Sequence, residues 1–274
     1  VLSKARARWG HEIFEELFVR IVGQCLGEGL VDGKKIYMDG SLVDANASNN
    51  SVVKGPPELI KELKKIYRKE EGKLDEYNKA PLGRPHYKPV NDEVMSKTDP
   101  DAAVVSNQSK GARPRYKNHR VVDDAHGVIT AVETTSGEVE ENRKLTELID
   151  QHEHNTGVRV ETVVADCQYG TADNFRKCHQ RGIRSHMGDL KAPQKGKGKR
   201  AGIFSEDSFQ YDAESDTYQC PAGQILKRRK HMKKREAYEY SAGIKICREC
   251  NIRSQCTRSA KSARTIKRHE DQEA

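Results

Sequence analysis

Two aspartates that each follow a short apolar run are the residues of this sequence best suited to metal chemistry. Asp39 comes after the run IYM, and Asp166 comes after the run TVVA. The carboxyl ends of strands in an α/β sheet line the crevice where ligands bind. Two carboxylates brought together there repel each other, and bound Mg²⁺ or Mn²⁺ removes that repulsion. Two such ions can clamp the attacking and leaving oxygens of a phosphoryl displacement.

A turn-capping role is the alternative for either aspartate, because each is followed within four residues by a glycine, Gly40 or Gly170. For a single Asp-Gly pair the turn interpretation is favoured. Two apolar runs that both lead into an aspartate, in a chain of net charge +8, favour a metal site formed by Asp39 and Asp166.

Four further residues are candidates for the site, and each also has a structural interpretation. Asp44 adjoins a second strand or turn, and we expect it at most to position a metal ligand without binding the metal itself. His119 lies inside an expected strand, where a lone histidine is more often packed or hydrogen-bonded than a metal ligand. Gln168 and Tyr169 come directly after the second aspartate, so they either contact a substrate or fill the turn.

Four of the seven cysteines lie in the last quarter of the chain, at Cys220, Cys247, Cys250 and Cys256. The CxxC spacing of Cys247 and Cys250 lets two thiolates hold one Zn²⁺, and the other two cysteines could complete the site. A redox pair and free thiols remain open alternatives, and a structural disulfide is less expected in a cytosolic protein. We hypothesise a zinc-ribbon-like insertion.

The balance of charge favours a polyanionic partner, because 49 Lys and Arg stand against 41 Asp and Glu. Two basic clusters, at residues 191–200 and 227–235, are candidates for contacts with DNA phosphates, although a charge run is more often a solvated surface. Nothing in them suggests base-specific recognition. The residues expected to contact DNA are Lys195, Lys197, Arg200, Lys227, Arg228, Arg229, Lys230, Lys233, Lys234 and Arg235.

The elements that would position these residues follow from the hydrophobic spacing. Helices are expected over residues 4–26, 58–79, 141–152 and 171–182, and strands over 35–39, 117–123, 128–135, 159–166 and 183–187, with a long irregular stretch over 80–115. A hairpin turn at 124–127 joins two of the strands. Hairpin and βαβ units together predict an α/β sheet with helices on its faces.

Three regions are expected along the chain. Residues 1–34 end an N-terminal helical region, residues 35–190 form the core with a helical and irregular insertion at about 50–115, and residues 191–274 form a basic, cysteine-rich insertion. No apolar run approaches the length of a membrane span and no signal peptide is visible, so we expect a cytoplasmic protein with no membrane partner. Both ends of the chain suggest a fragment of a longer protein.

The chain resembles insertion-sequence transposases of the DDE type, which have a catalytic domain of the ribonuclease H-like fold. The matching segments are MDGSLVDANAS, SKTDPDA, YKNHRVVDDAHGVITAVETTSGEVEEN and VVADCQYGTADN. The segments CPAGQILKRR and CRECNIRSQCT are similar to a cysteine-rich insertion found in one branch of these enzymes. The resemblance therefore implies a ribonuclease H-like mixed sheet flanked by helices, interrupted by a zinc-ribbon-like insertion.

The resemblance implies that Asp39 is the first catalytic acid and Asp166 the second, with both holding Mg²⁺ or Mn²⁺. The third acid of the family is a Glu on a helix after the insertion, and no segment of this chain matches its context. Glu270 and Glu273 lie in that part of the sequence without the expected neighbours. The third acid is therefore expected beyond Ala274.

The implied reaction is metal-assisted attack of water, and then of a 3′ hydroxyl, on DNA phosphodiesters. The implied partners are the terminal inverted repeats of a transposon, the target DNA and a second copy of the chain, at the bacterial-type nucleoid. Two alternatives remain open: a metal-dependent nuclease without strand transfer, and a non-catalytic zinc-ribbon protein that binds DNA.

Overall fold

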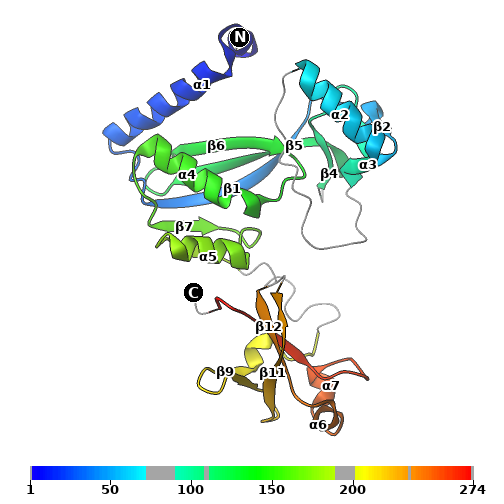
Figure 1. The fold of residues 1–274 in the computed structure, drawn as a ribbon. Helices are drawn as coiled ribbons and strands as arrows, with labels where there is room; N and C mark the ends of the chain where they lie inside the picture. Colours follow the sequence, from blue (N-terminus) through cyan, green and yellow to red (C-terminus); the bar gives the residue numbers. More distant parts are fainter. Residues whose placement is uncertain (1, 72–89, 108–110, 189–200, 234–235, 273–274) are drawn as a thin grey trace. The chain divides into compact units, whose positions relative to one another are not determined.

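The computed structural model describes residues 2–71, 90–107, 111–188, 201–233 and 236–272 (Figure 1). Contacts along the chain divide it into two units. The first unit is Val1–Gly170 with Gln180–Gly188, and the second unit is Thr171–His179 with Asp189–Ala274. Among the described helices, none combines the length and the apolar character needed to cross a bilayer.

The first unit is built around a mixed sheet. Its elements in chain order are α1 (Leu2–Gly27), β1 (Lys35–Asp44), η1 (Asn49–Ser51), β2 (Val52–Lys54), α2 (Pro57–Glu71), α3 (Val90–Glu93), β3 (Val94–Ser96), β4 (Ala103–Asn107), β5 (Gly111–Asp123), β6 (Ile129–Ser136), η2 (Glu141–Lys144), α4 (Leu145–Thr156), β7 (Thr162–Ala165) and β8 (Arg184–Met187).

Strand β1 has neighbours of both directions in this sheet. It pairs antiparallel with β5 and parallel with β7, and β8 continues the sheet parallel to β7. Strands β4 and β6 both pair with β5, while β2 and β3 form a separate two-stranded sheet. This mixed sheet with helices fits a ribonuclease H-like domain, as the resemblance predicted.

The core of the first unit lies between the sheet and α4. Burial alternates along β1, so that Ile36 and Met38 are buried while Tyr37 between them is exposed. Helix α4 buries Leu148 and Ile149 on the stripe that faces β5 and β6, and α1 packs against α4 (Figure 1). The sheet and α4 therefore form a rigid base for residues at the strand ends.

Several boundaries differ from the sequence prediction. The strand that begins at Lys35 does not end at Asp39, because β5 pairs with it as far as Asp44. The stretch 80–115 is not irregular in its described part, which holds α3, β3, β4 and the start of β5; strands of three to five residues are too short to show a period. Helix α1 is broken at Gly10, and residues 72–79 of the second expected helix lie outside the described residues.

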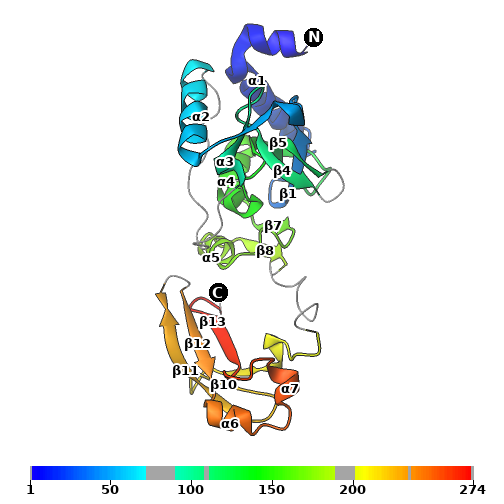
Figure 2. The same cartoon turned by 90° about the vertical axis from the view of Figure 1, so that its right-hand side faces the viewer.

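The second unit has an antiparallel sheet with strand order β13-β12-β11-β10-β9. Its elements are α5 (Ala172–Gln180), η5 (Glu206–Ser208), β9 (Gln210–Asp212), β10 (Thr217–Gln219), β11 (Ile225–Met232), β12 (Ala237–Ser241), α6 (Ile244–Arg248), α7 (Arg253–Cys256) and β13 (Thr265–His269). Phe209, Tyr218, Leu226, Tyr240 and Ile266 form its core. The short helices α6 and α7 lie at one end of this sheet (Figure 2).

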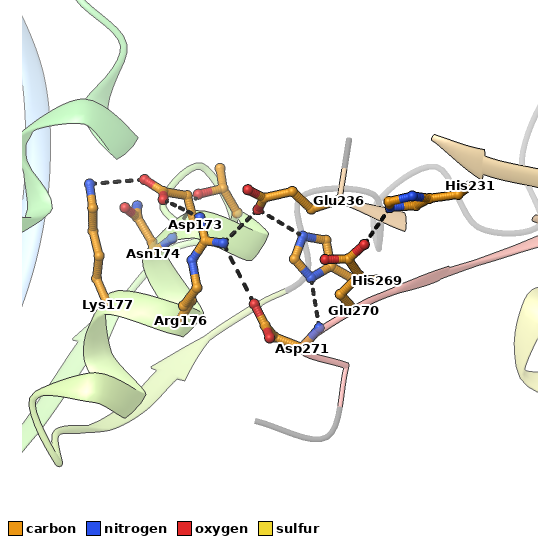
Figure 3. Close-up of polar contacts among 10 residues, drawn as sticks. Asp173, Asn174, Arg176, Lys177, His231, Glu236, His269, Glu270 and Asp271 are labelled. Carbon is orange, nitrogen blue, oxygen red and sulfur yellow. Dashed lines mark hydrogen bonds and ion pairs between the residues drawn. The ribbon is translucent and has the colours of Figure 1, made fainter. Parts of the chain in front are cut away.

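Helix α5 is held within the second unit by ion pairs (Figure 3). The Arg176 guanidinium lies 3.0 Å from Asp173 on its own helix, 2.5 Å from Glu236 after β11 and 3.6 Å from Asp271 after β13. Nearby, His231 pairs with Glu270 at 2.5 Å. Glu270, considered above as a third acid, is thus bound to a histidine of the second unit, while Glu273 lies outside the described residues.

Candidate active site

Asp39 and Asp166 come together through the register between β1 and β7. These strands run parallel, with Ile36 opposite Val163 and Met38 opposite Ala165. Asp39 is the next residue of β1 and Asp166 is the first residue after β7, and neighbouring strands lie about 4.8 Å apart. The side chains of both aspartates are exposed. The structure therefore brings together the two acids that the sequence analysis singled out.

The turn after β7 holds the second acid in place. The Gln168 backbone N–H donates to Asp166 Oδ1 at 2.8 Å, and the Tyr169 N–H donates to the Asp166 carbonyl at 3.2 Å. The Tyr169 side chain is fully buried, so it fills the turn. Asp166 does cap its turn, as the alternative interpretation held. A carboxylate has about four lone-pair sites, however, and one N–H donor leaves acceptor capacity for a cation.

A third carboxylate, Glu141, packs against β1 at Gly40, the residue after Asp39. It opens the short segment η2 before α4, and its side chain is 15% exposed. A Cβ atom added to Gly40 would lie only 2.7 Å from Glu141 Cδ, so this carboxyl group rests directly on the residue after Asp39. Lys117 on β5 approaches with Nζ 3.4 Å from Glu141 Oε1. The sequence analysis missed Glu141, because a loop acid among several others carries no periodic pattern.

The charges of this region act on one another. Burial raises the pKa of Glu141, the Lys117 ammonium lowers it, and the negative charges of Asp166 and Asp39 raise it again. Burial raises the pKa of Tyr169 as well, with further contributions from the same three carboxylates. The three carboxylates thus interact electrostatically and form one acidic centre, which consists of Asp39, Asp166 and Glu141.

The donors of the acidic centre suit a hard divalent cation, because Mg²⁺ and Mn²⁺ prefer carboxylate oxygens. In the present side-chain positions of the described residues, no three His, Cys, Asp or Glu residues are grouped closely enough to hold a metal ion. Three carboxylates repel one another, so rotation of the side chains is needed to gather them around one ion. Because Gly40 has no side chain, the Glu141 carboxyl group has room to lie beside the residue that follows Asp39.

The comparison with protein families identifies the family of this chain. The family described as Transposase DDE domain matches residues 90–264. The chain belongs to this transposase family. The matched range includes Asp166 and Glu141, and Asp39 precedes it. Neither a curated protein nor a solved structure gives a match. Membership implies a DNA-binding enzyme of nuclease or transposition chemistry, and such enzymes typically use a divalent metal such as Mg²⁺.

Two other polar residues of the transposase core have structural roles. Asp44 lies 2.7 Å from Nε of the buried Arg115, and it is not part of the acidic centre. His119 is fully buried and shares a hydrogen bond of 2.9 Å with the Thr135 hydroxyl. Burial lowers the pKa of His119 to about 4, which leaves the ring neutral near pH 7. The prediction that this histidine is packed and hydrogen-bonded is confirmed.

The four cysteines in the last quarter of the transposase chain line one cavity of about 30 Å³. All four are half-buried free thiols: Cys220, Cys247, Cys250 and Cys256. Burial raises the pKa of Cys256, and the pKa of Cys247 is likewise raised by burial but lowered by a hydrogen bond from the Arg264 backbone. Cys220 Sγ accepts the Gln224 backbone N–H at 3.3 Å. The predicted cysteine cluster is therefore present, without metal-binding distances among the described side chains.

The second basic cluster lies mostly on an exposed strand. Four of its residues belong to β11 and are exposed: Lys227, Arg228, Arg229 and Lys230. Arg228 lies over the Tyr238 ring at 4.7 Å and pairs with Asp216 at 3.0 Å. Lys233 follows the strand and is exposed as well. The other residues expected to contact DNA lie outside the described residues: Lys195, Lys197, Arg200, Lys234 and Arg235.

Proposed function

We propose that this chain supplies the metal-binding acids of a transposase that cleaves DNA phosphodiesters and transfers the freed 3′ end to a target. The observation that carries the proposal is the adjacency of Asp39 and Asp166 directly after the paired segments of β1 and β7, in a member of the transposase DDE family. A bound Mg²⁺ or Mn²⁺ would supply the Lewis acid that activates the nucleophile and stabilises the leaving oxygen.

The contribution of the chain itself is positioning. Two hydrogen-bonded strands hold the carboxylates on a rigid sheet, which orients ligands better than a loop does. The Gln168 N–H fixes Asp166 Oδ1, and the buried Tyr169 anchors the turn that presents this acid. The exposure of Asp39 and Asp166 leaves both carboxylates open to a DNA strand from solvent.

The test is a plasmid assay that scores nicking and joining separately in the presence of Mg²⁺ or Mn²⁺. We expect Asp39→Asn and Asp166→Asn each to lower the nicking rate at least about 100-fold. Removing a group that only supports a metal ligand already lowers metal affinity or activity about 10- to 100-fold. Asp32→Asn, which removes an exposed carboxylate of the same unit, is the matched control and should cut normally. Nicking that survives both substitutions would refute the proposal.

The same assay, together with a measurement of DNA binding, separates the open alternatives. Cleavage without joined products would indicate a metal-dependent nuclease. Binding of DNA without cleavage, unaffected by Asp39→Asn or Asp166→Asn, would indicate a non-catalytic DNA-binding protein. We favour the transposase because the family match spans the later part of the core and the cysteine segment together.

The cysteine cavity supports a second proposed site, for Zn²⁺. Its four sulfurs line one small space, and backbone N–H groups reach Cys220 and Cys247, as suits thiolates that ligate a metal. Metal analysis of the purified protein should find about one zinc per chain, as expected for a four-cysteine site. Cys250→Ser should release it and Cys25→Ser in α1 should not. Protein that carries no zinc when purified without chelators would remove this proposal.

We also propose that β11 contacts the DNA backbone. The exposed Lys and Arg side chains of β11 offer contacts to DNA phosphates, and each such contact increases the salt dependence of the affinity. A salt response of binding that stays flat, or that is unchanged by Lys227→Gln with Lys230→Gln, would count against this surface. Pairing of two chains around the transposon ends follows from the family resemblance and would be tested by the mass of the DNA complex.

A further inference from the structure

We propose that Glu141 is a third carboxylate of the metal site formed by Asp39 and Asp166. It stays paired with Lys117 until a divalent cation binds. The inference rests on the proposed function, since it concerns the same site. It assigns a role to a residue that lies inside the described chain and outside the insertion.

Glu141 lies in close contact with Gly40. A Cβ atom at position 40 would lie 2.7 Å from both Cγ and Cδ of Glu141 and 3.0 Å from its Oε1. Real Cβ atoms do not come so close, so only glycine lets this carboxyl group lie beside the residue that follows Asp39. Gly40 has an ordinary extended backbone within β1, and its glycine is therefore not needed for a turn. The close approach of Glu141 is the feature that accounts for it.

Helix α4 anchors the backbone of Glu141. Glu141 opens η2, which runs directly into this helix, and the neighbouring Lys144, Leu145 and Leu148 are buried. The backbone of Glu141 is therefore fixed by core packing, while the long side chain can still rotate. A ligand with a fixed backbone and a mobile carboxylate is suited to close on an incoming ion.

The balance of charge at the metal site also favours a third carboxylate. Two divalent cations carry four positive charges, and Asp39 with Asp166 supplies two negative ones. Glu141 would add a third negative charge and leave less to be compensated by the DNA phosphate. Lys117, 14% exposed, provides the matching positive charge for Glu141 at 3.4 Å. A cation that displaces Lys117 from Glu141 would free the ammonium to face the negative substrate.

An ordinary structural ion pair between Lys117 and Glu141 is the competing explanation, and two variants distinguish the two. Glu141→Gln and Lys117→Gln both abolish the ion pair, but only the first removes the carboxylate. Mn²⁺ binding to the full chain is measured from the electron paramagnetic resonance signal of the free ion, and from the rise in melting temperature with Mn²⁺. We expect Glu141→Gln to bind Mn²⁺ at least about 10-fold more weakly than the wild type. Lys117→Gln should bind no more weakly than the wild type.

Asp39→Asn is the reference variant, and it should also lose Mn²⁺ affinity. If Asp39→Asn weakens binding and Glu141→Gln does not, Glu141 is no ligand and the inference is wrong, while the proposed metal site stands. Equal weakening by Glu141→Gln and Lys117→Gln would overturn it too, because the ion pair alone would then explain the effect. If Asp39→Asn binds Mn²⁺ as the wild type does, the proposed site itself falls and this inference with it. Should Glu141→Gln fail to fold, Gly40→Ala displaces the same carboxylate without removing a charge.

Discussion

Replacing Gly40 by alanine should separate metal binding from stability in this protein. The added methyl group would meet Glu141 Cγ and Cδ at 2.7 Å, whereas carbon atoms in contact rest at about 3.5–4.0 Å. The Glu141 carboxylate must therefore retreat by about 1 Å. The atoms nearest to the new methyl group belong to the outer part of a flexible side chain, and so the backbone of β1 can stay where it is.

The effect on stability should be small. Alanine loses less chain entropy than glycine on folding, by roughly 0.5–1 kcal/mol in a strand interior. An off-rotamer or displaced side chain costs about as much, roughly 0.5–1.5 kcal/mol. The free energy of unfolding of Gly40→Ala should therefore lie within about 1 kcal/mol of the wild type. Mn²⁺ affinity should nevertheless fall by about 10-fold, because a displaced ligand no longer reaches the ion.

Urea unfolding without metal and Mn²⁺ titration measure the two quantities on the same protein. The double variant Gly40→Ala with Glu141→Gln completes a cycle: if Gly40 acts only through Glu141, the double variant should bind Mn²⁺ no more weakly than Glu141→Gln alone. Two results would refute the reasoning. One is unchanged Mn²⁺ affinity in Gly40→Ala, and the other is a loss of more than about 2 kcal/mol of stability, which would mean that the backbone had moved.

Three further predictions concern other parts of the molecule. Burial lowers the pKa of His119 to about 4, so the unfolded chain binds more protons than the folded chain between about pH 4 and 6.5. The free energy of unfolding should therefore be highest above about pH 6.5 and fall as the pH decreases towards 4. It should depend less on pH in His119→Gln. Chelation of zinc should lower the melting temperature of the wild type and of Cys25→Ser but not that of Cys250→Ser, and an equal response of all three would argue against the cysteine site. Lys227→Gln and Lys230→Gln should each reduce the slope of log affinity against log salt by about 1, and a slope that does not change would exclude these side chains as phosphate contacts.

The sequence carried most of the fold and one pair of acids, because both depend on apolar runs. Period-two alternation over residues 119–123 of β5, and buried residues four apart in α4, are strong patterns that local context does not override. Short strands are different. The three residues of β3 and the five of β4 form a pattern only once their partners are known, which is why this region was expected to be irregular.

Glu141 could not be found in this way. It is one of several acids in the segment GEVEEN, and nothing in the spacing distinguishes it from Glu138 or Glu140. Its place is set by the hairpin before it and by the packing of α4 after it, both of which act through long-range contacts. The one local signal is Gly40, a glycine within a strand, which can mark the close approach of another group. That signal becomes specific only when the neighbour is known.

The adjacency of Asp39 and Asp166, by contrast, follows from burial alone. Ile36 and Val163 are 0% exposed and Met38 is 4% exposed, so the register between β1 and β7 is fixed by the residues that fill the core. A slip by one residue would turn every side chain of a strand to the other face, exposing these apolar residues and burying Tyr37 in their place. Such a slip would also remove Asp39 from its position beside Asp166. The packing that stabilises the sheet is therefore the same packing that sets the two carboxylates side by side, and mutations that weaken this core should impair metal binding before they unfold the protein.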